Sequence, residues 1–148
     1  MLPPDAQRLA HIRDYCLEIR KTIERYGESF ETFDSDPDYQ RSVSFCILQI
    51  GELSGKLSAE YRLETTKQIQ WGPIKAMRNL VAHNYGSMSR EIIWETAVAD
   101  IPVLCEFCEQ QLQAFQNRTI SLPFHGGLIF CRNKHPPSER VLQTENSL

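Results

Sequence analysis

The chain of 148 residues lacks an apolar run of the length that a membrane-spanning helix needs, about 20 residues. Residues 1–5 have neither the basic start nor the apolar stretch of a secretory signal peptide. A basic excess is also absent, because the net charge is −3. This argues against a protein that coats nucleic acid through a broad basic surface, but it allows a small basic cleft. The sequence therefore predicts a soluble, cytoplasmic globular protein with no membrane segment.

The cysteine count is odd, since the chain has five, so they cannot all pair in disulfides within the chain. Four of them fall on apolar helical stripes: Cys16, Cys46, Cys105 and Cys108. Cys131 lies near the C-terminus. We interpret them as reduced thiols of a protein core. Cys105-x-x-Cys108 alone supplies two of the four ligands of a structural zinc site, so we predict no metal and no other cofactor.

The sequence has no strong strand pattern before residue 116, whereas helical periodicity is clear. Apolar residues recur at spacings of three and four in four stretches, which predicts helices with one buried face: residues 9–26, 39–57, 74–81 and 94–115. The fold class is therefore all-α, an antiparallel bundle of four to five helices. We place this bundle in residues 1–115 and an irregular C-terminal tail in residues 116–148, where periodicity stops.

Helix ends are marked by residues with defined backbone preferences. Asp5 is a predicted N-cap of the first helix, and Gly27 its end. Asp36 followed by Pro37 should open the second helix, and Ser89 should cap the last one. Pro102 lies inside the last helix and should kink it, because it cannot donate a hydrogen bond to Val98.

Two glycines and two tryptophans in these helices are expected to serve packing. Gly51 and Gly55 lie four residues apart in the second helix, where they permit the close approach of another helix. Trp71 and Trp94 are expected in the core, although either ring could stack on a base.

One short segment combines residues of chemical interest, Arg78 to Tyr85. Arg78 carries a permanent charge on a fork that fits phosphate oxygens. His83 titrates near neutral pH and can transfer a proton. Together they suffice for metal-free cleavage of a phosphodiester whose substrate brings its own nucleophile, as RNA does in its 2′-hydroxyl.

The spacing of this pair raises a geometric problem. Residues five apart on an ideal helix point about 140° away from each other, so Arg78 and His83 cannot both face one ligand. Three solutions remain open. The helix ends near Ala82 and His83 swings round, two subunits share the site across a two-fold axis, or the two residues have unrelated roles.

Resemblance to a known family bears on this choice. Arg78, four residues, His83, one residue and Tyr85 resemble the motif of the HepT-like toxins of the HEPN superfamily, as does Asn79 after the arginine. Ile50-Gly51-Glu52 resembles the family's second helix, and Trp71 precedes the motif helix as a family tryptophan does. Residues 92–94 and Pro102 are similar to its last helix. The resemblance covers residues 5–115.

The resemblance implies a bundle of HEPN type that forms a homodimer, in which the two motifs face each other. It implies an RNA endonuclease toxin that needs no metal, from a type VII-like toxin–antitoxin system, with mRNA or tRNA as substrate. Arg78 and His83 would be catalytic and Asn79 supporting, with a 2′,3′-cyclic phosphate as product. Tyr85 would be AMPylated by a cognate minimal nucleotidyltransferase, the antitoxin.

Other interpretations of the same residues remain. Glu52 is expected either to orient Arg78 through an ion pair or to be a solvated surface carboxylate. The chain as a whole could instead be a non-catalytic HEPN module that binds a nucleotide or a partner protein, or a plain helical scaffold.

Overall fold

The computed structural model of the chain describes residues 1–84 and 89–120, except for the side chains of His83 and Asn84. This part is all-α and contains no strand. Its elements are α1 (Pro3–Tyr26), α2 (Phe30–Ser35), α3 (Pro37–Lys56), α4 (Ala59–Thr65), α5 (Trp71–Asn84), α6 (Arg90–Glu95), a π-helical turn η1 (Thr96–Asp100) and α7 (Ile101–Ile120). The predicted fold class is confirmed.

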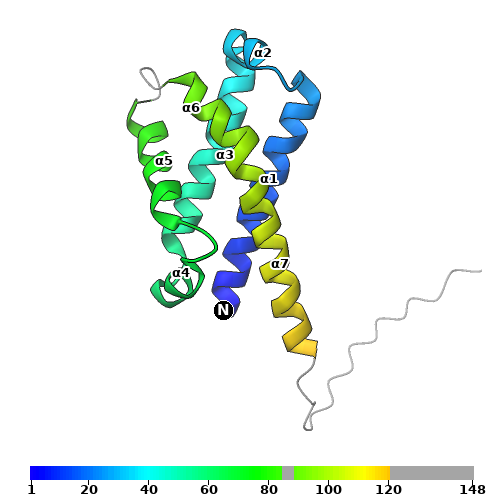
Figure 1. Cartoon of the computed structure of the whole chain (residues 1–148), viewed down its shortest axis with the longest axis vertical. Coiled ribbons are helices and arrows are strands. Elements are labelled where there is room, and N and C mark those ends of the chain that lie inside the picture. The colour runs from blue at the N-terminus through cyan, green and yellow to red at the C-terminus, as the bar shows by residue number, and fades with distance from the viewer. Residues whose placement is uncertain (85–88, 121–148) are drawn as a thin grey trace, which may run out of the picture.

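Long helices alternate in direction, and short ones turn the chain (Figure 1). α1 runs up, α3 down, α5 up, and α6, η1 and α7 run down as one continuous helix. The short helices α2 and α4 lie at opposite ends of the bundle. α3 is central, because α1 and α5 both pack along it, and α7 packs against α1.

The core consists of the apolar stripes that the spacing predicts. Leu9, Ile12, Ile19, Tyr39 and Val43 are fully buried in it. Trp71 is also buried, and its indole N–H donates to the Thr65 hydroxyl at 2.9 Å. Trp94 packs against the Phe33 ring. Both tryptophans therefore pack as predicted.

The four described cysteines are buried free thiols: Cys16, Cys46, Cys105 and Cys108. Burial raises the pKa of Cys46 to about 11 and that of Cys108 to about 12. They are therefore protonated at neutral pH and poor nucleophiles, which agrees with the interpretation as core thiols. Cys131 lies outside the described residues.

Two predicted helix boundaries are confirmed. Gly27 ends α1 with φ of 103°, a left-handed conformation that glycine adopts without strain. The Asp36 carboxylate accepts from the backbone N–H groups of Asp38 and Tyr39 and caps α3, with Pro37 as its first residue.

Asp5 is not the N-cap that the sequence suggested, because Pro3 already begins α1. Its buried carboxylate instead accepts from the backbone N–H of Ser58 at 2.9 Å and from the Ser58 hydroxyl at 2.6 Å. Arg8 pairs with the same carboxylate at 3.1 Å. Burial raises the pKa of Asp5, but the bonds from Ser58 and the charge of Arg8 outweigh this, and the net shift is downward.

The last helix continues further than predicted and contains a different irregularity. α7 is helical to Ile120, five residues beyond the point at which the apolar spacing ends, and residues 116–120 are exposed. Ahead of Pro102 the helix widens into the π-helical turn η1, in which the Ile101 N–H donates to the Thr96 carbonyl. A π-turn is a known way to accommodate an interrupted hydrogen-bond ladder.

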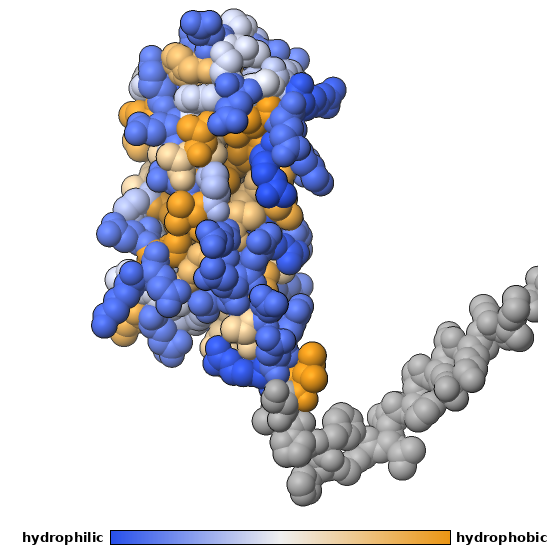
Figure 2. Space-filling model, turned by 45° about the vertical axis from the view of Figure 1, so that its right-hand side comes forward, coloured by the Kyte–Doolittle hydropathy of each residue, from blue (hydrophilic) through white to orange (hydrophobic). Residues whose placement is uncertain are grey.

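The surface is largely hydrophilic, with separate apolar areas between the charged side chains on the face that Figure 2 shows. The large apolar residues that remain exposed include Phe45 on α3 and Leu63 on α4. Among the described residues, no helix has the length and apolar character that crossing a membrane requires.

Candidate active site

Arg78 lies over Gly51 at the contact between α5 and α3. A Cβ atom added to Gly51 would overlap the Cβ of Arg78, and it would lie 3.2 Å from the carbonyl oxygen of Ile74. The same addition at Gly55 would meet nothing within 4 Å. The prediction of close helix approach is therefore right for Gly51 and wrong for Gly55.

The guanidinium of Arg78 is held from two sides. Its Nε and Nη2 both contact the carboxylate of Glu52, and Nη1 donates to the Asn79 side-chain oxygen at 3.0 Å. The side chains of Arg78 and Glu52 are 33% and 35% exposed, so the pair lies at the surface with its stems covered. The ion pair that the sequence left as one of two possibilities is thus formed. Contacts within the described residues use three of the five N–H groups of Arg78, which leaves donors for a phosphate oxygen.

The backbone of His83 is helical, because α5 ends one residue later at Asn84. This removes the first of the three geometric solutions, in which the helix ends near Ala82. Arg78 points toward α3, as its contacts with Gly51 and Glu52 show. Position 83 therefore falls on another side of α5, about 140° away. Tyr85 lies outside the described residues.

One surface of the bundle contains this ion pair, and we call it the α3–α5 face. On α3 it is formed by Arg41, Phe45, Leu48 and Glu52, at spacings of four, three and four. On α5 the exposed residues Gly72, Ala76 and Asn79 have the same spacing, which position 83 continues. Phe45 is 55% exposed there, an unusual state for a phenylalanine.

A groove of about 320 Å³ lies between α3, α5, η1 and α7. Its lining is mainly apolar and includes Ile50, Ile74 and Met77, but neither Arg78 nor Glu52. Helix spacing places these apolar residues on the opposite side of the α3–α5 contact from the ion pair. The groove is therefore separate from the Arg78 site.

Comparison with known proteins identifies the family. The family model described as "Ribonuclease HepT-like" matches residues 12–111. The chain belongs to the ribonuclease HepT-like family. A relative from Caldanaerobacter subterraneus subsp. tengcongensis, named "Putative RNase TTE0752", is 33% identical over 105 residues, which are 71% of this chain and 91% of the relative. No solved structure matches the chain.

The matched region of this HepT-like chain begins inside α1 and ends inside α7, so it contains the whole Arg78 site. The structure brings Arg78, Asn79 and Glu52 together. It does not describe the side chains of His83 and Tyr85, whose roles remain predictions. The sequence did not predict that the Arg78 side chain packs directly on Gly51. A glycine directly before an acidic residue in a helix was the available signal, but it does not name the partner.

Proposed function

We propose that this HepT-like protein is the toxin of a type VII-like toxin–antitoxin pair, a metal-independent RNA endonuclease of the cytoplasm that acts on mRNA or tRNA. Family membership supports the ribonuclease activity. The observation that carries the proposal is the position of Arg78. Glu52 and Asn79 hold its guanidinium, which still has N–H donors at the surface. A fixed cation is suited to a phosphate that gains negative charge during the reaction.

In the proposed reaction the 2′-oxygen of a ribose attacks the adjacent phosphorus, and the bond from phosphorus to the 5′-oxygen breaks. His83 accepts the proton of the 2′-hydroxyl as general base, a role typically worth about 10²–10⁴-fold in rate. The leaving 5′-oxygen receives a proton from a second histidine in its imidazolium form, His83 of the partner subunit, which becomes neutral as the first is protonated. The products are a 2′,3′-cyclic phosphate and a 5′-hydroxyl, and Arg78 stabilises the phosphorane-like charge.

A homodimer solves the geometric problem of the motif. Arg78 and position 83 lie about 140° apart around α5, and a dimer would offer two copies of each residue to one phosphate. Two chains paired through the α3–α5 face would bring the motif of each next to the other across a two-fold axis. The 55% exposure of Phe45 on α3 supports this face as the contact surface.

Tyr85 is proposed to be the site of inactivation. Its hydroxyl would attack the α-phosphorus of ATP on the cognate minimal nucleotidyltransferase, forming a phosphodiester and releasing pyrophosphate. AMP placed two residues from His83 would block the cleft and repel RNA by its negative charge.

The ribonuclease proposal is tested with purified protein, RNA and EDTA. Wild type should cleave RNA and leave cyclic-phosphate ends. Arg78→Ala and His83→Ala should each lose at least about 100-fold in rate. His11→Ala, which removes an exposed histidine of α1, is the matched control and should keep full activity. Intact RNA with unmodified wild type would favour the non-catalytic binding module.

The AMPylation proposal needs the cognate transferase, ATP and intact-mass measurement. Wild type should gain mass in AMP units and lose its ribonuclease activity. Tyr85→Phe should gain none, whereas Tyr61→Phe, a change on α4, should be modified like wild type. A mass gain that persists in Tyr85→Phe would contradict the assignment.

A further inference from the structure

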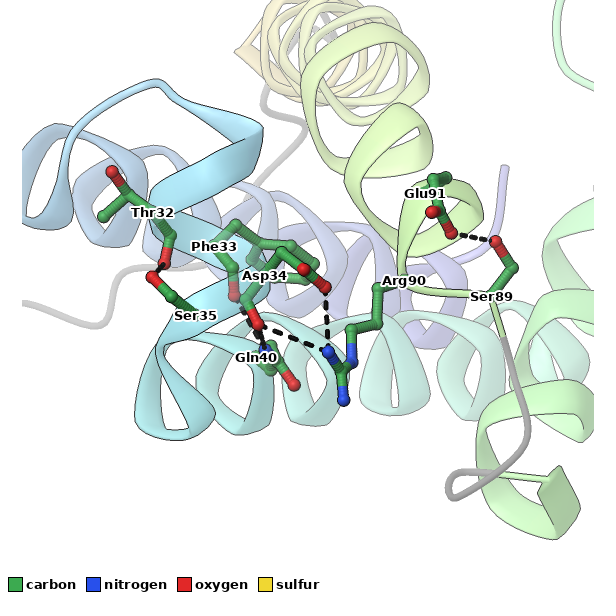
Figure 3. A network of polar contacts seen from close by, with 8 residues as sticks. All are labelled: Thr32, Phe33, Asp34, Ser35, Gln40, Ser89, Arg90 and Glu91. Carbon is green, nitrogen blue, oxygen red and sulfur yellow. Dashed lines mark hydrogen bonds and ion pairs between the residues drawn. The ribbon is translucent and has the colours of Figure 1, made fainter.

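A second polar network anchors the chain where α6 begins (Figure 3). Arg90, the first residue of α6, donates from Nη1 to the Asp34 carboxylate at 2.8 Å and to the Asp34 carbonyl at 3.3 Å. Gln40 of α3 donates from Nε2 to the carbonyls of Phe33 and Asp34, at 2.8 and 2.9 Å. Residues 56 apart in the sequence are thus joined, and α2, α3 and α6 meet at this point.

Asp34 is a firm attachment point because α2 is itself anchored. Phe33 is fully buried and packs against Tyr39 of α3 and Trp94 of α6, with ring centroids 5.2 and 5.4 Å away. The two carbonyls that Gln40 binds belong to the last turn of α2, where a helix has no internal donors for them. α6 is therefore joined to α2 twice, by an apolar contact and by the Arg90–Asp34 pair.

The usual cap of α6 is missing, which increases the importance of Arg90. Ser89 is the N-cap residue, but its side chain accepts no hydrogen bond from the helix. Its hydroxyl donates to the Glu91 carboxylate instead. Among the described contacts, the polar side-chain link between the first turn of α6 and the rest of the bundle is that of Arg90, beside the apolar contact of the buried Ile93.

We call residues 78–90 the catalytic segment of the proposed function. The residues at both of its ends are held, directly or through Asp34, by side chains of α3. Arg78 is held by Glu52 of α3, and Arg90 is held by Asp34, which Gln40 of α3 supports. Gln40 and Glu52 are 12 residues apart, about 18 Å along a rigid helix. In the sequence, His83 lies between these two held residues.

We propose that Asp34 and Arg90 are positioning residues of the ribonuclease site: they fix the end of the catalytic segment that follows His83, as Glu52 fixes the end that begins with Arg78. This inference rests on the proposed function. The side chains of Arg90 and Asp34 are 53% and 46% exposed, and exposed ion pairs add little to stability. A displacement of about 1 Å in a catalytic group can nevertheless cost about 100-fold in rate.

The test compares Asp34→Ala and Arg90→Ala with the charge-reversed double variant Asp34→Arg/Arg90→Asp. Each single variant should lose roughly 10- to 100-fold in kcat, with KM unchanged and Tm within about 4 °C of wild type. The double variant should recover part of the lost kcat. Asp38→Ala breaks another surface pair, the more exposed one with Arg41 at the same end of the bundle, and it should behave as wild type.

Amide hydrogen exchange gives a readout that does not depend on activity. The peptide covering residues 80–89 should exchange faster in Asp34→Ala and Arg90→Ala than in wild type or Asp38→Ala. Wild-type kcat in both single variants, unchanged exchange in this peptide, or a double variant no better than the singles would each overturn the inference. An inactive wild type would overturn the proposed function alone, because the exchange result still reports whether Asp34 and Arg90 hold the segment.

Discussion

Arg78 combines two requirements that usually conflict, a buried stem and an accessible charge. Gly51 meets the first, because only a residue without a Cβ lets the Arg78 stem lie against α3. Glu52, the next residue, meets the second by binding the guanidinium at the surface. Two adjacent residues of α3 thus fix both the position of Arg78 and the direction of its charge.

The two glycines of α3 give a matched pair of substitutions. Gly51→Ala should push α5 away from α3 and lower the free energy of unfolding by about 1–3 kcal/mol, with a loss of ribonuclease activity. Gly55→Ala adds the same methyl group into open space and should be neutral or stabilising by up to about 1 kcal/mol. Urea denaturation measures both, and equal effects of the two changes would show that Gly51 has no special role.

Asp5 should make stability dependent on acid pH. Its folded-state pKa is lowered, so its contribution is complete above the unfolded pKa of about 3.9 and is lost as the pH falls through the folded pKa. Asp5→Asn should therefore cost about 1–3 kcal/mol at pH 7 and progressively less below about pH 4. Unfolding measured from pH 7 to pH 2 checks this, with Asp14→Asn, whose exposed carboxylate pairs only with Arg13 in the described part, as a near-neutral control. A constant difference at all pH values would contradict the assignment.

At the scale of elements, the last helix shows how a proline is accommodated without breaking a helix. Ile93, Ala97 and Ile101 are all buried although they are spaced four and four, which would turn them away from one line on a regular α-helix. The wider turn η1 takes in an additional residue and keeps this face toward the core. The π-turn therefore serves the packing of α6 and α7 as well as Pro102.

Replacement of Pro102 tests this account. Pro102→Ala restores a backbone donor, and a proline inside a helix costs up to about 3 kcal/mol relative to alanine. Because η1 already relieves part of this cost, we expect a gain of about 1 kcal/mol, seen as a higher Tm with unchanged helix content by circular dichroism. A fall in Tm would mean that Pro102 itself is needed to keep the π-turn.

Local sequence signals predicted the elements better than their connections. The three-four spacing identified the long helices, and Asp36-Pro37 and Gly27 marked real boundaries, because these signals act within one turn of the chain. Asp5 misled because its partner, Ser58, is 53 residues away. The packing of Arg78 on Gly51 and the Arg90–Asp34 pair each join separate helices. Helical periodicity therefore could not predict either contact.

At the scale of the whole molecule, the α3–α5 face is the surface through which we propose that two chains pair. It combines the exposed Phe45 with the surface ion pair of Arg78 and Glu52. The apolar groove near Ile74 lies on the other side of the α3–α5 contact and does not join it. Oligomeric state and catalysis should therefore depend on the same surface.

A charge placed on this face should separate the subunits. Phe45→Glu should convert the proposed dimer to a monomer and abolish RNA cleavage, because each site then lacks the partner's motif. Size-exclusion chromatography with light scattering measures the mass. Leu63→Glu, on α4 and 78% exposed, is the control for an added charge and should remain dimeric. A dimeric Phe45→Glu would place the interface elsewhere.

The pairing of Arg78 with Glu52 also bears on selectivity among anions. A free phosphate or a nucleotide that reaches the surface meets a locally neutral pair, so the remaining N–H donors of Arg78 attract it only weakly. A long polyanion that also binds elsewhere on the protein does not depend on Arg78 alone for its affinity. We therefore expect the site to ignore the abundant small anions of a cell and to respond to a phosphate that other contacts hold in place.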